Sequence, residues 1–232
     1  MIPADSRSNH DRSDVSMQHL RRITKVSLPT FHGDFMMYVY GEQDEKEHVA
    51  LTVGPVGDEA TDGTRNGEPV LVRVHSECMT GDRFGSRRCD CGEQLEESMR
   101  LLQERGRGVL LYLRQEGRGI GLTRKMYAYT LQEQGLDTVE ANLTLGLPED
   151  ARDYQVAAEM LLDLDVSWAL VLTNNPAKIE GLRRYGVEVV ERLPLPISPN
   201  PSNARYLRTK REKMGHLLPR QDGAVGKDSL RG

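Results

Sequence analysis

The three cysteines of this 232-residue chain lie close together in the sequence, at a spacing that suits a metal ion. Cys78, Cys89 and Cys91 form a C-x10-C-x-C pattern, and Gly81 and Gly85 allow the intervening loop to turn. Thiolates are good zinc ligands, and three of them leave one position of a tetrahedral ion for water. A zinc ion with such a position activates water near neutral pH. The spacing therefore predicts a catalytic zinc site that hydrolyses its substrate.

Two other interpretations of the cysteines remain open. They could be buried free thiols, or His75 could be the fourth ligand of a structural zinc site. The sequence from Cys89 to Gly92 is polar and typical of a turn, which disfavours buried free thiols. His75 falls in a predicted strand, from which its side chain can point away from the cysteines.

A glycine-rich segment between a predicted strand and a predicted helix is typical of an anion site. Gly117, Gly119 and Gly121 leave backbone amides near the helix start accessible to an anion. The Glu116 carboxylate beside them could accept hydrogen bonds from N1–H and the exocyclic amine of guanine, which adenine cannot offer together. This segment predicts guanine recognition, and the alternative is a solvated glutamate in a turn.

A second strand-to-helix junction also predicts an anion site. Asn174 or Asn175 caps the helix, Pro176 takes its first position, and Lys178 lies in its first turn. The charge of a lysine there is unfavourable because it opposes the helix dipole, which indicates that an external anion binds at this position. The simplest candidate is a phosphate that contacts the Lys178 ammonium, the free backbone amides and the Thr173 hydroxyl. The alternative is an ordinary surface lysine.

Acidic residues are frequent in segments 137–142 and 147–153, around Arg152, and we expect a loop in this region. If Mg²⁺ accompanies a polyphosphate, its oxygen ligands come from these carboxylates or from the substrate itself. A solvated acidic surface is the alternative.

The elements that must position these residues alternate between strand and helix. The pattern predicts a layered α/β/α domain with a mixed, largely parallel sheet and an N-terminal antiparallel β-meander. Residues 1–18 are expected to be a disordered leader, 19–218 a single catalytic domain and 219–232 a flexible tail. Predicted strands cover 23–28, 34–40, 48–53, 69–75, 108–114, 169–173 and 187–192. Predicted helices cover 93–105, 122–134, 154–164 and 176–185, and a last one starts at Ser202 or Asn203 and ends at His216.

The composition excludes fibrous and membrane-embedded classes. Hydrophobic residues make up 38% of the chain, as in a globular enzyme, and no apolar run approaches the length of a bilayer span. The net charge of −4 gives no general attraction to nucleic acid. The odd number of cysteines favours metal binding over disulfides. We therefore expect a cytoplasmic protein that binds neither nucleic acid nor membranes.

Six motifs in order together resemble one enzyme family. They are R-V-H-S-E-C, G-D-x-F-G-S-R-R-C-D-C-G, R-Q-E-G-R-G-I-G-L, D-T-V-E-A-N, L-T-N-N-P-x-K and Y-L-R-T-K-R-E-K-M-G-H. Between about Leu28 and Leu218 the chain resembles GTP cyclohydrolase II. The resemblance implies a homodimeric hydrolase that requires zinc and Mg²⁺ and performs the first step of riboflavin biosynthesis. This enzyme converts GTP to 2,5-diamino-6-ribosylamino-4(3H)-pyrimidinone 5′-phosphate, formate and diphosphate.

The resemblance also implies a role for individual residues. Cys78, Cys89 and Cys91 correspond to the zinc ligands. Asp150 corresponds to the proton acceptor, Arg152 to the nucleophile toward the α-phosphate, and Tyr129 to the tyrosine associated with ring opening. The corresponding nucleotide contacts are Arg73, Val74, His75, Ser76, Glu77, Gln94, Glu116, Gly117, Arg118, Thr138, Thr173 and Lys178.

Alternatives remain for two of these roles and for the whole activity. A guanidinium stays protonated at cellular pH, so Arg152 is better suited to stabilise the leaving diphosphate than to form a covalent bond. Tyr129 shares a helix face with Leu122 and Met126, so core packing is its alternative role. The rival functions are an enzyme that releases a formylated pyrimidine and a catalytically silent, zinc-containing nucleotide-binding regulator. With no room for the dihydroxybutanone-phosphate synthase domain of bifunctional relatives, the chain is expected to be monofunctional.

Overall fold

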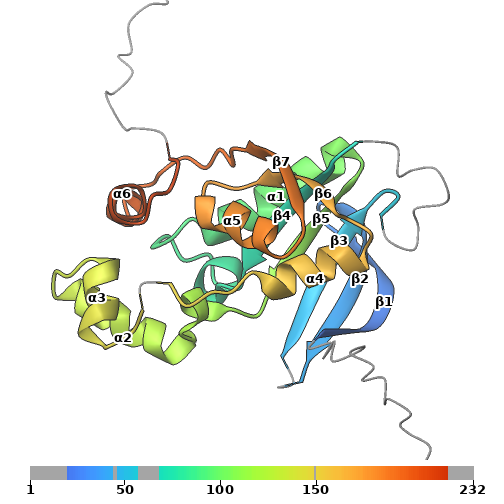
Figure 1. Cartoon of the computed structure of the whole chain (residues 1–232). Helices are drawn as coiled ribbons and strands as arrows, with labels where there is room; N and C mark the ends of the chain where they lie inside the picture. The colour runs from blue at the N-terminus through green and yellow to red at the C-terminus, as the bar shows by residue number, and fades with distance from the viewer. Residues whose placement is uncertain (1–19, 44–45, 57–67, 149, 219–232) are drawn as a thin grey trace, which may run out of the picture.

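The computed structural model describes residues 20–43, 46–56, 68–148 and 150–218 (Figure 1). The predicted leader, 1–18, and the predicted tail, 219–232, lie outside the described residues. Their boundaries therefore stay predictions.

The described strands form one mixed seven-stranded sheet in the order β1-β2-β3-β5-β4-β6-β7. The predicted N-terminal meander is confirmed, because β1, β2 and β3 pair antiparallel. β3 then pairs antiparallel with β5, whereas the pairs β5–β4, β4–β6 and β6–β7 are parallel. The strands are β1 (Leu20–Thr30), β2 (Gly33–Glu42), β3 (Glu47–Val53), β4 (Val70–Ser76), β5 (Gly108–Leu113), β6 (Trp168–Leu172) and β7 (Glu188–Leu193).

Helices cover both faces of the sheet, as the predicted α/β/α layering requires. α1 (Cys91–Arg105) packs on one face, and α4 (Gln155–Asp163) and α5 (Pro176–Arg184) pack on the other. Side chains alternate along β4, so Val72 and Val74 point into the core beneath α4 and α5. Arg73 and His75 therefore share the α1 face of the sheet, at the carboxyl end of β4, where the cysteine loop begins.

Three further helices lie together on one side of the molecule, away from β1–β3 (Figure 1). They are α2 (Leu122–Glu133), α3 (Thr138–Thr144) and α6 (Ala204–Lys213), and α3 contacts both of the others. Two short helices lie in the connections near the cysteines: η2 (Met79–Arg83) and η3 (Glu116–Gly119).

The expected acidic loop is wrong for residues 137–142, which form α3, whereas residues 147–148 and 150–153 form neither helix nor strand, as expected. The Asp137 side chain accepts hydrogen bonds from the backbone amides of Val139 and Glu140, at 2.8 and 3.0 Å. The Glu140 carboxylate accepts in return from the Asp137 amide at 2.9 Å. This capping box occupies the two carboxylates and stabilises the helix start.

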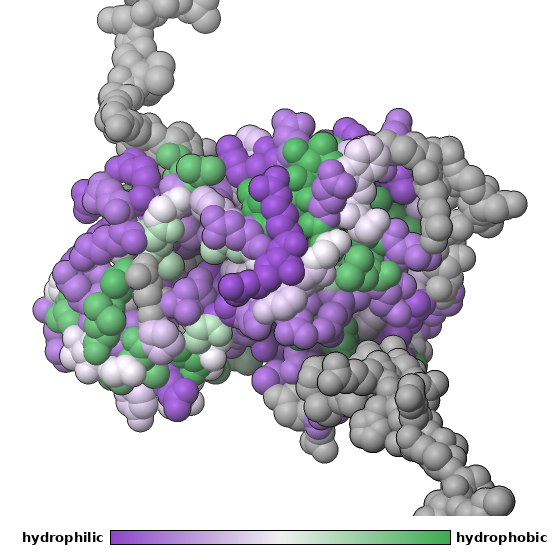
Figure 2. All heavy atoms as spheres, viewed as in Figure 1, coloured by the Kyte–Doolittle hydropathy of each residue, from purple (hydrophilic) through white to green (hydrophobic). Residues whose placement is uncertain are grey.

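Hydrophilic residues cover most of the face shown in Figure 2, and hydrophobic residues appear there in several separate groups. Of the described helices, none combines the length and the apolar character needed to cross a bilayer.

Candidate active site

The three cysteine sulfurs lie together at the sheet edge formed by the carboxyl ends of the parallel strands. Cys78 follows β4, and Cys91 is the first residue of α1. All three sulfurs lie within 4.8 Å of one another, and Cys78 Sγ is 3.7 Å from Cys89 Sγ. Two sulfurs each about 2.3 Å from a tetrahedral zinc ion lie about 3.8 Å apart. The cluster therefore fits zinc, which argues against the interpretation as unrelated free thiols.

Gly81 leaves the space between the sulfurs open. A Cβ atom at this position would lie 2.9 Å from Cys89 Sγ, 3.0 Å from Cys91 Cβ and 3.3 Å from Cys78 Sγ. Any side chain here would occupy space beside the cluster that an ion needs.

His75 does not join the sulfur cluster of the described chain, although its buried Nδ1 has no hydrogen-bond partner. Its Nε2 lies 3.1 Å from both carboxylate oxygens of Asp82, and its ring stacks on that of Tyr112. Asp82 also accepts from the Cys78 backbone amide at 2.9 Å and so fixes the backbone at Cys78. Within the described ranges, no fourth His, Cys, Asp or Glu atom joins the cluster. The geometry thus does not support the structural site with His75 as fourth ligand.

The cluster and the predicted nucleotide contacts line one pocket. It includes every predicted site residue except Val74 and Asp150. Val74 is buried in the core, but its carbonyl oxygen accepts from Lys178 Nζ at 2.6 Å. Asp150 contacts Arg152, which does line the pocket. The structure therefore brings the predicted residues together, while their individual roles stay predictions.

Positive charge dominates the pocket, although the chain has a net charge of −4. Among the described residues that line it, only Glu77 and Glu116 are carboxylates. The basic lining side chains are Arg73, Arg118, Lys125, Arg152, Lys178 and Lys210. Such a concentration of one sign attracts a polyanion locally.

A buried hydrogen-bond network connects the sheet to the cysteine loop. Arg73 Nη2 donates to Gln94 Oε1 at 2.7 Å, and Gln94 Nε2 donates to Asp90 Oδ2 at 2.5 Å. Asp90 lies between two cysteines and also accepts from Lys210 Nζ of α6 at 2.9 Å. Burial lowers the pKa of Arg73 to about 10, so this guanidinium stays protonated at neutral pH.

Lys178 is buried, so the alternative of a surface lysine is wrong. Asn175, rather than Asn174, caps α5, since its side chain accepts from the Ala177 amide at 3.0 Å. Burial, and next the charge of Arg73, lowers the pKa of Lys178 well below its usual range. A bound anion would reverse this effect and favour the charged ammonium.

Arg152 and Asp150 form a close ion pair. Arg152 Nε donates to Asp150 Oδ1 at 2.8 Å, and the Arg152 amide donates to the same oxygen at 3.0 Å. Burial acts to lower the pKa of Arg152, but Tyr154 and Asp150 together raise it above its usual value. The guanidinium is therefore firmly cationic.

Tyr129 lies on the pocket side of α2, and the Arg88 guanidinium carbon is 4.3 Å from the centre of its ring. Burial raises the pKa of its hydroxyl to about 12, so the group keeps its proton at neutral pH. Neither hydrophobic core of the described chain includes Tyr129. Its position favours a role at the site over core packing.

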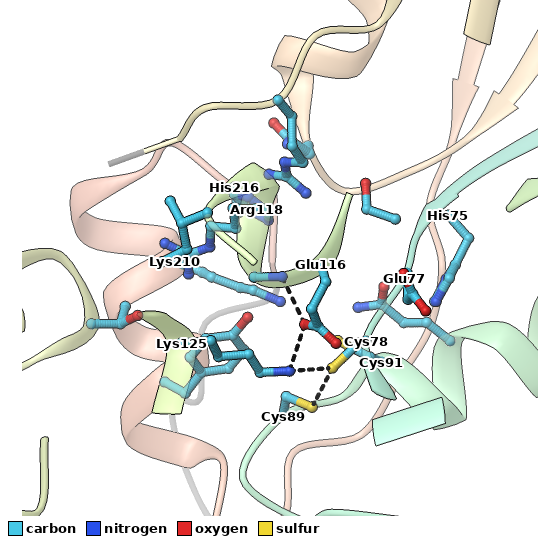
Figure 3. Close-up of a pocket in the computed structure, with 18 of the residues that line it drawn as sticks. His75, Glu77, Cys78, Cys89, Cys91, Glu116, Arg118, Lys125, Lys210 and His216 are labelled. Carbon is cyan, nitrogen blue, oxygen red and sulfur yellow. Dashed lines mark hydrogen bonds and ion pairs between the residues drawn. The ribbon is translucent and has the colours of Figure 1, made fainter. Parts of the chain in front are cut away.

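Glu116 is already bonded within the protein (Figure 3). Its Oε2 accepts from the Met79 amide at 2.7 Å, and its Oε1 accepts from the Gly117 amide at 2.7 Å and from Lys125 Nζ at 2.9 Å. A carboxylate has about four lone-pair sites. Bidentate binding of guanine therefore requires that at least one of these three bonds is released.

Several pocket-lining residues have no role predicted from the sequence, among them Lys125, Tyr206, Lys210 and His216. Lys125 precedes Tyr129 by four positions on α2, a spacing that places both on one helix face. The other three come from α6 and the segment after it. The Leu217 amide donates to the Asn174 carbonyl at 2.9 Å and holds this segment beside the start of α5.

Comparison with known proteins gives a consistent result. The family model described as GTP cyclohydrolase II matches residues 21–194. The chain is 54% identical over 215 residues to "Riboflavin biosynthesis protein RibBA" of Mycobacteroides abscessus, which covers 89% of this chain and 51% of that protein. The protein of the same name from Salinispora tropica is 57% identical over 198 residues, covering 84% and 48%. The chain thus spans about half the length of the relatives it matches.

Proposed function

Because the chain belongs to the GTP cyclohydrolase II family, we propose that it opens the imidazole ring of GTP with release of formate and diphosphate. The pyrimidine product is 2,5-diamino-6-ribosylamino-4(3H)-pyrimidinone 5′-phosphate, and the reaction is the first step of riboflavin biosynthesis. One observation supports this proposal above the others: the sulfur cluster and a wall of cationic side chains line the same pocket. A nucleoside triphosphate has matching parts, a ring to be hydrolysed and a polyanion.

Cys78, Cys89 and Cys91 would hold the zinc ion. When bound, zinc supplies a Lewis acid that activates water toward the ring carbon released as formate. Tyr129 lines the same pocket and keeps its proton at neutral pH, so it can donate a hydrogen bond or a proton to the opening ring.

The cationic wall would bind the triphosphate. Arg152 is held as a cation by Asp150, which favours stabilisation of the departing diphosphate over covalent attack by the guanidinium. Although burial opposes it, the hydrogen bond from Arg152 lowers the pKa of Asp150 below its ordinary value. Asp150 can therefore act as a proton acceptor only after the substrate separates it from Arg152.

Glu116 would select guanine by accepting from its N1–H and exocyclic amine. Gly117 and Arg118 beside it both have left-handed backbone conformations, with φ of 64° and 62°. Such a conformation is unfavourable for an arginine and is typical of residues held in place at a functional site.

The proposed enzyme also requires Mg²⁺, forms a homodimer and acts in the cytoplasm. Mg²⁺ would accompany the triphosphate, with phosphate oxygens as its main ligands, since the lining carboxylates are few. The enzyme would be a homodimer, as the family resemblance implies. It would act in the cytoplasm, where reducing conditions keep metal-binding thiols available.

Incubation of the purified chain with GTP, Mg²⁺ and Zn²⁺ tests the proposal, with formate, diphosphate and pyrimidine measured separately. We expect the three products in equal amounts, and their loss in Cys89→Ser. Diphosphate without formate would identify the enzyme that releases a formylated pyrimidine. Bound GTP without any product would identify the silent regulator.

A further inference from the structure

Lys125 is a buried lysine on α2 that lines the pocket but has no individual role in the proposed reaction. Its ammonium nitrogen lies 3.1 Å from Cys78 Sγ, 3.0 Å from Thr80 Oγ1 and 2.9 Å from Glu116 Oε1. An ammonium has three donors, so these three acceptors satisfy it completely. Figure 3 shows the Lys125 nitrogen between the Glu116 carboxylate and the Cys78 sulfur.

We propose that Lys125 is a positioning residue that joins the Glu116 segment to the metal-binding cysteines and offsets the charge of the Cys78 thiolate. The inference rests on the proposed function, because it requires a metal ion at the cysteine cluster. Three thiolates outweigh the charge of a divalent ion, and Glu116 places a second anion nearby. An ammonium between two buried anions compensates both.

The contact with Cys78 also has an electronic consequence. A hydrogen bond from a cation withdraws electron density from a thiolate, and outer contacts of this kind tune the metal that the sulfur binds. Cys78 therefore donates less charge to the ion than a free thiolate would. Lys125 would in this way keep a bound zinc ion a stronger Lewis acid than three unmodified thiolates would leave it.

The contact with Glu116 connects this effect to the nucleotide. The same carboxylate accepts from the amide of Met79, the residue directly after Cys78. A guanine bound at Glu116 would thus act on two groups that contact Cys78, the ammonium and the adjoining backbone. Occupancy of the base site is in this way linked to the surroundings of one metal ligand.

A purely structural role is the competing explanation, in which Lys125 is only the buried partner of Glu116. The two explanations differ in the electronic state of the metal. Cobalt(II) in place of zinc reports this state directly, through the sulfur-to-cobalt charge-transfer band in the near-ultraviolet. The band is measured without substrate and does not depend on turnover.

We expect Lys125→Met to shift this band to longer wavelength, because the sulfur then holds its electrons less tightly. Arg124→Met is the matched control: it removes the neighbouring cation of α2, which is exposed, and its spectrum should superimpose on that of the unmodified protein. A Lys125→Met spectrum identical to the unmodified one at equal cobalt content overturns the inference.

Glu116→Gln provides a second test that does not require Lys125→Met to fold. The substitution leaves the Cys78 thiolate as the one anion beside the Lys125 ammonium. The hydrogen bond from Lys125 to Cys78 should then strengthen, and the charge-transfer band should move to shorter wavelength. An unchanged band overturns the inference. Absence of any thiolate–cobalt band in the unmodified protein would refute the metal site itself. A normal band without GTP turnover would refute the proposed function alone.

Discussion

Lys210 Nζ of α6 lies 2.9 Å from Asp90 Oδ1. Asp90 stands between Cys89 and Cys91 in the sequence, directly before α1. The side chains of Lys210 and Asp90 are 10% and 3% exposed, so the ion pair is buried. α6 lies beyond residue 194, where the family match ends. The C-terminal helix is nevertheless attached to the cysteine loop and completes the pocket wall.

Lys210→Met should strongly destabilise the protein, because it leaves the Asp90 carboxylate buried without its cation. Loss of one partner of a buried ion pair typically costs about 3–5 kcal/mol. Urea denaturation of the metal-free protein measures the loss. Lys213→Met on the same helix should change stability less, because Lys213 is 44% exposed and its partners Asp137 and Glu140 keep 12% and 53% of their side chains exposed. Equal effects of the two substitutions would contradict the importance of this ion pair.

Gly81→Ala should weaken zinc binding while the fold persists. Its Cβ would enter the space between the three cysteines, and Gly81 does not have the left-handed backbone that would strain an alanine. We expect a loss of zinc affinity of about 10–100-fold, the range seen when the surroundings of a metal ligand are altered. Competition with a chromogenic chelator measures the affinity.

Gly85→Ala is the control for that experiment. Gly85 has a left-handed φ of 61°, but an added Cβ would meet nothing within 4 Å. The substitution should cost about 1–2 kcal/mol of stability and leave zinc affinity unchanged. Similar affinities for the two alanine variants would show that the space at Gly81 is not needed by the ion.

Tyr129→Phe should slow ring opening by about 10²–10⁴-fold, the usual contribution of a positioned proton donor. Diphosphate release should be less affected, so an unopened or formylated intermediate accumulates and can be identified by mass spectrometry. Tyr127→Phe, on the same helix but 60% exposed, should leave the rate unchanged. An unaltered rate in Tyr129→Phe would assign this residue to packing.

His216 makes stability depend on pH. Burial, followed by the charges of Lys210, Arg152, Arg118 and Lys178, lowers its pKa from 6.5 to about 3. Between these values the unfolded chain binds more protons than the folded one. The contribution of His216 to stability is therefore fully present above pH 6.5 and is lost as the pH falls toward 3.

His216→Asn should remove this pH dependence. Relative to the unmodified protein, the variant should gain stability as the pH falls from about 7 to about 5, by at most about 1.4 kcal/mol per pH unit. Denaturant titrations at several pH values provide the comparison. A stability difference that stays constant over this range would show that His216 titrates normally in the folded protein.

Local sequence patterns predicted most of the elements of the sheet, but they could not predict its order. Alternating hydrophobic residues and turn residues located the strands and the N-terminal meander. The antiparallel pairing of β3 with β5 depends on contacts between segments far apart in the chain. The helix α3 was missed although its signal was present: the acidic residues Asp137 and Glu140 have capping-box spacing, and we interpreted them as an exposed loop.

Some residues of the candidate site could likewise be predicted from local sequence, whereas others depend on how the chain packs. The cysteines and the glycine-rich turn have distinctive local spacing, so the sequence located them. Lys125 and Lys210 are ordinary lysines of amphipathic helices until the fold buries them beside Cys78 and Asp90. Burial of Lys178 is likewise a property of the packing between α5 and β4, which the sequence alone does not reveal.

X-ray absorption at the zinc edge, on freshly purified chain that converts GTP, tests the central claim most directly. Our account predicts one zinc ion per chain, bound by three sulfur atoms at about 2.3 Å and one lighter atom that exchanges with solvent. An active chain that contains no transition metal, or whose zinc is held by four protein side chains, would contradict it.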